Sequence, residues 1–406
     1  MAVSAATDRA ADPAGAKRDE RRALAVACGA HVLHDGYADL IWVALPIWQA
    51  EFGLSYAAVG ILRTMFSGAM AALQIPAAAL AERVGASAVL AGGTALCGLC
   101  YVLAGASAGF VLLMAALLVG GLGAATQHPI ASALVARAFA GPRAMAVFGT
   151  YNFAGDIGKM ALPAAATALL YLMPWRPAYA LLGAIGIAGA IAIFIFMPRF
   201  APAPVTTADA ASSASDGFKP GYFLLLAIAA IDNVTRSGFL VFLPFLLIAK
   251  GASVTTAGFA LTMVFIGGAL GKLACGWIAD RFGIIATICI TKALTAAGML
   301  GVLLLPLPAT LVLLPLFGIM LNGTSSATYG SVPYFATPAA RNRAFSWFYT
   351  GTLAPSALAP TIAGFFGDMA GVPVTVALIA ALVLLTLPLS WILRPALYTY
   401  EAQARA

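Results

Sequence analysis

Residues 276–283 read GWIADRFG, and residues 78–85, which lie 198 positions earlier, read AALAERVG. The acid, the arginine and the final glycine of the two octapeptides correspond: Glu82, Arg83 and Gly85 in the first, Asp280, Arg281 and Gly283 in the second. The same offset relates Pro46 to Pro244, Gly53 to Gly251, Ser55 to Ser253, Gly60 to Gly258, Arg143 to Arg341 and Tyr151 to Tyr349. A repeat this long indicates an internal duplication, in which the two halves of the chain fold alike.

The composition excludes a soluble globular protein. Hydrophobic residues make up 62% of the 406 residues, charged residues make up 9%, and the mean hydropathy is +0.96. So few charges cannot cover a surface that faces water, and the chain is therefore expected to lie in a lipid bilayer. Apolar stretches of about 20 residues, the length that crosses the hydrocarbon core, occur at roughly 23–48, 54–80, 85–105, 107–132, 143–171, 177–198, 221–249, 254–279, 284–305, 308–335, 342–366 and 372–394.

The duplication and these stretches together predict an all-α integral membrane protein with twelve transmembrane helices in two pseudo-symmetric bundles of six. In large secondary transporters, an axis along the membrane normal relates two such bundles. The expected parts are an N-terminal tail at 1–22, a first bundle at 23–198, a linker rich in Ala, Pro, Ser and Thr at 199–219, a second bundle at 220–395 and a C-terminal tail at 396–406.

Basic residues near the ends of the spans predict the orientation, because Lys and Arg are retained on the cytoplasmic side. One side of a twelve-span path has only Arg176 and Lys250, whereas the other carries Lys17, Arg18, Arg21, Arg22, Arg83, Arg137, Arg143, Arg199, Lys219, Arg281, Arg341, Arg343 and Arg394. Both termini and the linker are therefore expected in the cytoplasm. The same bias accounts for the net charge of +7, so no nucleic-acid partner is expected.

Ionisable residues inside the spans indicate the functional site, because a charge at a helix centre costs at least about 2.5 kcal/mol and normally faces a cavity. They are Asp35, Asp39, Asp156, Asp232, Arg63, Lys159, Arg236, Lys272, Lys292, His31, His34 and His128. Asp156 and Lys159 are three residues apart and can pair on one helix face. Asp232 and Arg236, four residues apart, can do the same.

Asp35 is the expected carrier of a coupling proton. It lies near mid-membrane, with His31 one turn before it and no cation on its own helix face. Desolvation favours the protonated form of a lone carboxyl, and a histidine one turn away can relay the proton. Asp39 is a second candidate carrier. Asp39 and Arg63 are expected at similar depths in the membrane, so the two can also pair. A purely structural hydrogen bond from Asp35 to a neighbouring helix is the alternative role.

The cations within the spans favour an anionic or zwitterionic substrate. Lys272 stands where the offset places Gln74, and three further cations add to the positive charge. The expected substrate-binding residues are His34, Tyr37, Arg63, His128, Tyr151, Asp156, Lys159, Asp232, Arg236, Lys272, Tyr329 and Tyr349. For the tyrosines, and for His128 before Pro129, helix packing is the alternative.

The repeated octapeptides are expected to act as gates. A carboxylate beside an arginine at a cytoplasmic helix end can pair with a neighbouring helix and with helix dipoles, which forms a latch that breaks when that face opens. A solvated turn without a switching role is the alternative. The gating residues are Glu82, Arg83, Gly85, Gly276, Asp280, Arg281 and Gly283.

The octapeptide pattern resembles the loop signature of the major facilitator superfamily, and the resemblance covers the whole chain. Four further segments are similar to the fosmidomycin-resistance branch of drug exporters: 30–35 (AHVLHD), 49–52 (QAEF), 123–132 (GAATQHPIAS) and 155–163 (GDIGKMALP). The resemblance implies the major facilitator fold and a monomeric proton-driven antiporter of a bacterial inner membrane. Such a protein exports a small drug-like compound, with the proton gradient as its energy source and without a cofactor.

The sequence departs from that branch at positions that bear on the substrate. His34 and Asp156 stand where the resemblance implies an amide, and Asp39 where it implies a small polar residue. Ile130 replaces an acid, and Leu162 replaces the glycine expected before Pro163. The identity of the compound is therefore not carried over from the resemblance.

Other functions remain as alternatives. An uptake symporter for a metabolite anion would use the same residues in the opposite direction, and a divalent-metal transporter would use His31, His34, Asp35 and Asp39 as ligands. No second histidine-rich helix or soft-ligand cluster supports a metal site, so none is expected. An enzyme is not expected either, because the sequence has no Gly-x-Ser-x-Gly, His-Glu-x-x-His or phosphate-loop motif. A sensor is not expected either, because a sensor normally carries a soluble output domain and the tails are short.

Overall fold

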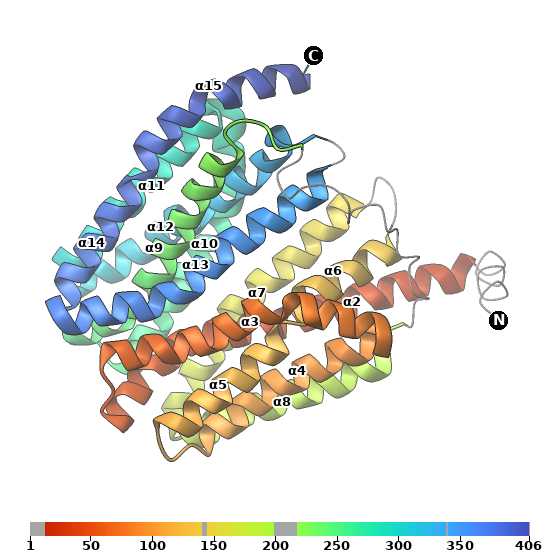
Figure 1. Ribbon diagram of the computed structural model, residues 1–406. Coiled ribbons are helices and arrows are strands. Elements are labelled where there is room, and N and C mark those ends of the chain that lie inside the picture. Colours follow the sequence, from red (N-terminus) through yellow and green to blue (C-terminus); the bar gives the residue numbers. More distant parts are fainter. Residues whose placement is uncertain (1–12, 140–143, 199–216, 338–339, 406) are drawn as a thin grey trace. The chain divides into compact units, whose positions relative to one another are not determined.

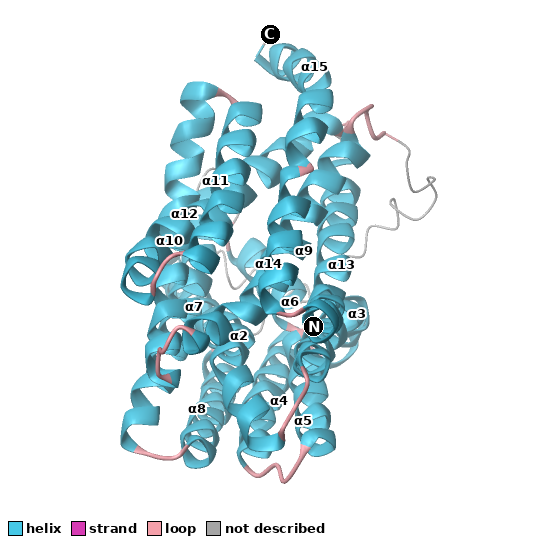
Figure 2. Ribbon diagram, turned by 90° about the vertical axis from the view of Figure 1, so that its left-hand side faces the viewer, coloured by secondary structure: helices cyan, strands magenta, loops and turns pink. Residues whose placement is uncertain are grey.

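The computed structural model describes residues 13–139, 144–198, 217–337 and 340–405. These residues form helices and no strand, apart from one isolated bridge between Phe218 and Ala336 (Figures 1 and 2). Most of the predicted linker lies outside the described residues, as do Arg143 and Arg199.

The helices follow one another in the order α2 (Pro13–Phe52), α3 (Tyr56–Val84), α4 (Ala86–Gly105), α5 (Phe110–Ala124), α6 (Gln127–Ala138), α7 (Ala144–Leu172), α8 (Trp175–Phe196), α9 (Tyr222–Ala249), α10 (Val254–Phe282), α11 (Ile284–Leu304), α12 (Leu307–Ser331), the 3-10 helix η3 (Val332–Phe335), α13 (Arg341–Ala370), α14 (Val372–Leu384) and α15 (Thr386–Arg405).

Nine stretches of the described chain are helical, long and apolar enough to cross a membrane. Three of them join consecutive elements: α5 with α6, α12 with η3, and α14 with α15. The long helices α2, α7 and α13 are more polar, and with them the spans among the described residues number twelve. The predicted twelve-helix membrane fold is confirmed. Two of these more polar helices, α2 and α7, carry the ionisable residues that meet in the site described below.

The chain forms two compact units. Unit 1 takes its described residues from Met1–Ile41 and Met65–Val205, and unit 2 from Trp42–Thr64 and Thr206–Ala406. The end of α2 and the start of α3 therefore belong with the second half of the sequence, although the chain passes through them early. Each of these two helices is shared between the units.

In unit 1, α4 packs against both α5 and α8 (Figure 1). Glycines allow the closest approach: a Cβ placed on Gly98 of α4 would lie 2.6 Å from the carbonyl oxygen of Gly183 on α8. Small residues at such crossings let helix backbones pack closely in a membrane, where the hydrophobic effect drives no association between helices. The approach of α4 to α8 therefore requires glycine at Gly98.

In unit 2, α10 packs against α12, and α9 packs against α13 (Figure 1). The start of α3 is fastened to the end of α13 by Asp368, whose two carboxylate oxygens accept the backbone N–H groups of Tyr56 (2.8 Å) and Ala57 (2.9 Å). Farther along the same two helices, the Thr64 hydroxyl donates to the Ala357 carbonyl at 2.8 Å. Ser55, the N-cap residue of α3, accepts the Ala58 N–H at 3.2 Å, so the carboxylate from another helix adds to the usual N-cap.

Each of the two repeated octapeptides ends in a glycine that has a positive φ angle. Gly85 between α3 and α4 has φ of 103°, and Gly283 between α10 and α11 has φ of 85°. Both values lie in the region where a side chain is strained, so glycine makes the tight helix-to-helix connection in each half. The acids and arginines that precede these glycines are exposed.

Candidate functional site

One face of α2 carries three polar side chains into the interior of unit 1. His31, His34 and Asp35 follow the i, i+3, i+4 spacing that places residues on one helix face, and all three are buried. An unpaired charge in such a place is costly, so the partners of Asp35 determine what the site can do.

Asp35 is surrounded by positively charged or protonatable nitrogens. Its Oδ2 lies 3.2 Å from Nζ of Lys159 and 3.5 Å from Nε2 of His31, and its Oδ1 lies 3.8 Å from Nε2 of His34. The sequence-based interpretation of Asp35 as a lone carboxyl is therefore wrong. Its own helix does lack a cation on that face, but α7 supplies one.

Lys159 is shared between two carboxylates. Its Nζ also lies 3.6 Å from Oδ1 of Asp156, which confirms the pair expected from their i, i+3 spacing. The side chain of Lys159 is 32% exposed, whereas those of the two aspartates are about one-tenth exposed. The cluster therefore joins two carboxylates, one ammonium and the neighbouring histidines.

Two glycines of α7 let this helix reach α2. A Cβ on Gly158 would lie 2.1 Å from the Val32 carbonyl oxygen, and one on Gly155 would lie 2.6 Å from Oδ2 of Asp35. A side chain at Gly158 would meet the backbone of Val32 and force the helices apart, whereas one at Gly155 would displace the side chains of Asp35 and His31. The glycine spacing in the segment 155–163 thus positions Lys159 beside Asp35.

The histidine rings are held by aromatic and backbone contacts. Nδ1 of His31 lies 2.8 Å from the Tyr151 carbonyl oxygen, and the His31 ring stacks on the Tyr151 ring with centroids 4.2 Å apart. His128, at the start of α6, meets His34 edge-on with ring centroids 4.8 Å apart. His128 is exposed, although the two histidines of α2 are buried.

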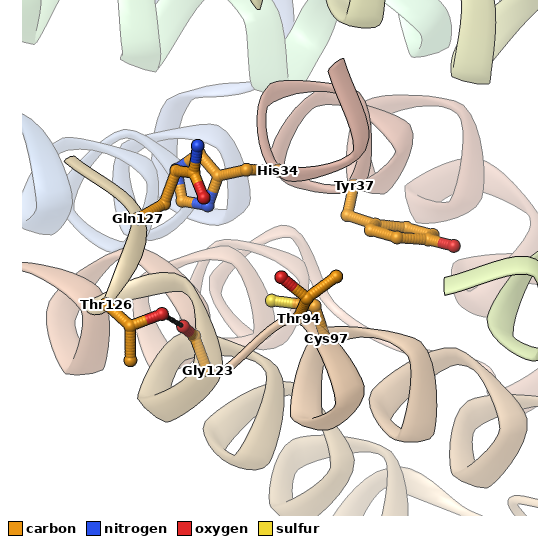
Figure 3. Close-up of a pocket in the computed structure, with 7 residues that line it drawn as sticks. All are labelled: His34, Tyr37, Thr94, Cys97, Gly123, Thr126 and Gln127. Atoms are coloured by element: carbon orange, nitrogen blue, oxygen red, sulfur yellow. Dashed lines mark hydrogen bonds between the residues drawn. The ribbon is translucent and has the colours of Figure 1, made fainter. Parts of the chain in front are cut away.

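A narrow polar pocket adjoins this cluster in unit 1 (Figure 3). It is lined by His34, Tyr37, Thr94, Cys97, Gly123, Thr126 and Gln127. Within the lining, the Thr126 hydroxyl donates to the Gly123 carbonyl at 2.9 Å. Thr94, Thr126 and Gln127 were not predicted from the sequence as site residues. The available signal was the presence of hydrogen-bonding side chains inside otherwise apolar spans.

Unit 2 has its own buried ion pair, formed by Lys292 of α11 and Asp232 of α9. Lys292 is fully buried. The expected partner of Asp232 was Arg236 on the same helix, but the side chain of Arg236 instead donates to Asn233 at 2.5 Å and to Asn322 at 3.2 Å. Helix packing explains the difference, because a lysine from a neighbouring helix reaches the carboxylate directly.

The other predicted site residues are not part of the two ion-pair clusters. Some lie elsewhere in unit 1 and the others lie in unit 2. In unit 2, Cζ of Arg63 lies 4.4 Å from the centroid of the Trp42 ring. The ring centroids of Tyr329 and Tyr349 are 4.9 Å apart, and the Tyr329 hydroxyl lies 3.1 Å from the Thr352 hydroxyl. Lys272 is half-buried on α10. In unit 1, Tyr37 donates to the Leu182 carbonyl at 2.6 Å and so contributes to packing. Asp39 lies one turn after Asp35 on α2.

Comparisons with known proteins gave a match of family and a match of fold. A family model described as Major Facilitator Superfamily matches residues 27–231 and 222–405. Two solved structures of a bacterial homolog to the human lysosomal transporter Spinster are similar in fold, each with 18% sequence identity. The inward-facing unoccupied form has a TM-score of 0.76, with 94% of this chain and 98% of the other covered. The inward-facing occupied form has a TM-score of 0.69, with 94% and 96% covered. No curated protein matched the sequence.

Proposed function

Because the chain belongs to the major facilitator superfamily, whose members are secondary transporters that work by alternating access, we propose that it is a proton-coupled antiporter. In this proposal it exports a small zwitterionic, drug-like compound, and Asp35 carries the coupling proton. The antiport direction agrees with the drug-exporter resemblance of the α2, α6 and α7 segments. No enzymatic step and no cofactor enter the proposal.

The ion pair between Asp35 and Lys159 carries the proposal. Nζ of Lys159 lies 3.2 Å from Oδ2 of Asp35 and 3.6 Å from Oδ1 of Asp156. Either a proton on Asp35 or a positively charged group of the substrate can replace Lys159 as the partner of Asp35. The two then exclude each other, and mutual exclusion at one site is the thermodynamic basis of antiport. His31 is placed to pass the proton to or from Asp35.

A zwitterion suits the whole set of proposed binding residues better than a simple cation does. Positive charge on Lys159, Arg236 and Lys272 suits an acidic group, whereas the Asp35 carboxylate suits an amine. The proposed substrate contacts remain His34, Tyr37, Arg63, His128, Tyr151, Asp156, Lys159, Asp232, Arg236, Lys272, Tyr329 and Tyr349. The octapeptides at 78–85 and 276–283 are the proposed gates.

The salt bridge between Asp35 and Lys159 also supports a second candidate, proton symport of an anion. An anionic substrate that draws the ammonium away from Asp35 leaves a buried carboxylate without its partner. That carboxylate gains a proton more readily, so anion and proton bind together. The same residues then support uptake in place of export, and the sign of the proton flux distinguishes the two candidates.

The proposed setting is a bacterial inner membrane, with a monomer whose two termini lie in the cytoplasm. This orientation follows from the basic residues at the span ends. It places the two octapeptide loops on the cytoplasmic face.

Proton flux in proteoliposomes tests the mechanism. Purified protein is reconstituted with a pH-sensitive dye in the lumen, and a loaded compound is allowed to leave down its gradient. The panel begins with fosmidomycin and includes anionic, zwitterionic and cationic compounds. Antiport acidifies the lumen as the compound leaves, because protons enter in exchange, whereas symport makes the lumen alkaline.

Variants test whether the proton flux depends on Asp35. Asp35→Asn is expected to abolish the pH change while exchange of labelled for unlabelled compound continues. Glu51→Gln makes the corresponding change from carboxylate to amide at an exposed residue outside the cluster and is expected to keep the pH change. Efflux of a compound from wild-type vesicles without any pH change would refute proton coupling. A pH change that persists in Asp35→Asn would move the proton site elsewhere.

A further inference from the structure

All three histidines of the 406-residue chain converge on one carboxylate. Nε2 of His31 and Nε2 of His34 lie 3.5 Å and 3.8 Å from the two oxygens of Asp35. His128 meets both histidine rings edge-on, with centroids 5.6 Å and 4.8 Å away. Two spans that are separate in sequence thus bring every imidazole of the chain to the same place.

The spacing of the ligand atoms approaches that of a metal site. Bonds of about 2.0–2.1 Å from zinc to nitrogen and oxygen place neighbouring ligand atoms about 3.3 Å apart in a tetrahedron. The distances from Nε2 of His31 to Oδ2 of Asp35 and from Nε2 of His34 to Oδ1 exceed that by a few tenths of an ångström, with each histidine facing a different oxygen of the carboxylate. One ligand atom from each of His34, Asp35 and His128 lies within 4.8 Å of the other two. His128 is exposed, so rotation of its ring can close the remaining gap.

The orientation of His31 is a second, independent observation. Its Nδ1 lies 2.8 Å from the Tyr151 carbonyl oxygen, so the neutral ring donates from Nδ1 and directs the lone pair of Nε2 toward Asp35. Metal-ligating histidines are typically fixed in this manner, with the second ring nitrogen bonded to a carbonyl or carboxylate. Tyr151 thereby holds Nε2 of His31 beside Asp35, where it is available as a fourth ligand.

The donor set and the charge select the kind of ion. Imidazole nitrogens with one carboxylate suit zinc and similar transition-metal dications, whereas calcium and magnesium prefer oxygen ligands alone. The position beside Asp35 is occupied by the ammonium of Lys159, whose side chain is 32% exposed. This side chain can move toward solvent when another cation takes its place.

We propose that His31, His34, Asp35 and His128 form a binding site for a divalent transition-metal ion of the zinc class, and that the ion competes with Lys159 for Asp35. The proposal does not depend on the direction of transport or on proton coupling, because it concerns binding alone. It predicts one ion per chain. Binding weakens in acid, since the ligands must be deprotonated.

Cobalt(II) provides the test, because its visible absorption reports coordination by nitrogen and oxygen ligands. Full-length protein is purified without an affinity tag, stripped of metal and titrated with Co²⁺, and Zn²⁺ is then added to displace it. The expected result is a saturable absorption band that corresponds to one Co²⁺ per chain and that Zn²⁺ removes.

Two sets of variants have expected effects of opposite sign. His34→Ala and His128→Ala each lower Co²⁺ affinity by at least about tenfold, the loss that removing even an outer-shell partner causes. Lys159→Met raises the affinity, because it removes the competing ammonium. A merely damaged fold cannot produce that gain. Cys97→Ser, which alters the adjoining pocket lining but not the four ligands, leaves the affinity unchanged.

The proposal is overturned if the wild-type protein shows no saturable Co²⁺ band. It is also overturned if the band survives in the double variant His34→Ala/His128→Ala, or if Lys159→Met binds Co²⁺ more weakly than wild type. Size-exclusion profiles of every variant establish that each remains folded. A lost band in a folded variant therefore reports loss of ligands.

Discussion

Lys292 is fully buried against Asp232, and we predict that this pair controls the stability of unit 2. Lys292→Met leaves a buried carboxylate without its partner, which typically costs about 3–5 kcal/mol. The double variant Lys292→Met/Asp232→Leu removes both charges and is expected to regain most of that loss. Thermal unfolding in detergent, followed by circular dichroism, measures the two effects.

A surface ion pair would give a different result. If Lys292→Met unfolds at the wild-type temperature, or if the double variant is no more stable than the single one, the pair does not act as a desolvated unit. Lys250→Met is the matched control. Lys250 is half-buried near the end of α9 and bonds backbone carbonyls, so no buried carboxylate is left unpaired.

At the residue scale, the sequence predicted contacts within one helix better than contacts between helices. The Asp156–Lys159 pair follows from spacing alone and is present. The partners of Asp35 and Asp232 come from α7 and α11, and their reach depends on helix crossings that no periodicity encodes. The glycines at 155 and 158 were a usable signal, because small residues mark where helices approach.

At the element scale, we predict that the approach of α7 to α2 tolerates no side chain at Gly158. A Cβ there would lie 2.1 Å from the Val32 carbonyl, so Gly158→Ala pushes the helices apart and moves Lys159 away from Asp35. Overpacking of this kind typically costs about 1–3 kcal/mol. The expected results are a lower unfolding temperature and loss of compound-driven proton flux.

The same helix offers a matched control. Gly149 also lies in α7, but a Cβ there would meet nothing within 4 Å. Gly149→Ala is expected to keep both stability and flux. If the two alanine variants behave alike, the close contact between the helices does not position the cluster.

Hydropathy located the spans but not the ends of the helices. The first span was expected at about 23–48, whereas α2 runs from Pro13 to Phe52, because a helix can continue into water beyond the apolar segment. The expected span at 107–132 is divided into α5 and α6 around Ala125 and Thr126. This break sets the start of α6, where His128 joins the cluster, and the Gly-rich run before it and Pro129 after it were the available signal for a bend.

At the scale of the whole molecule, we predict the orientation from the basic residues. In a variant that lacks the five native cysteines, Glu51→Cys at the end of α2 should react with a membrane-impermeant maleimide in intact cells. Arg83→Cys at the end of α3 should react only after the membrane is opened. Both native side chains are exposed, so access depends on the side of the membrane.

The reverse labelling pattern would place the termini outside and would refute the assignment of the octapeptide loops to the cytoplasm. Labelling of both positions in intact cells would indicate that the maleimide reaches the two faces. A cytoplasmic marker protein that stays unlabelled in the same cells controls for leakage.

The duplication predicted the number of helices and the similarity of the halves, but it does not reveal how the chain divides into compact units. The 198-residue offset separates the halves near the linker, whereas Trp42–Thr64 belongs with unit 2. The hydrogen bonds that hold this segment, from Tyr56 and Ala57 to Asp368, join residues far apart in sequence. No local pattern identifies such partners.

This fastening has a consequence for how the protein is made. Tyr56 leaves the ribosome 312 residues before Asp368, so the start of α3 enters the membrane long before the carboxylate that fastens it has been synthesised. Unit 2 cannot be completed until α13 has been synthesised, however early its first segment is inserted. A polypeptide that stops at the linker therefore carries a piece of the other unit with it. When the halves are produced as two separate chains, the second chain must recover that piece from the first to complete its own packing.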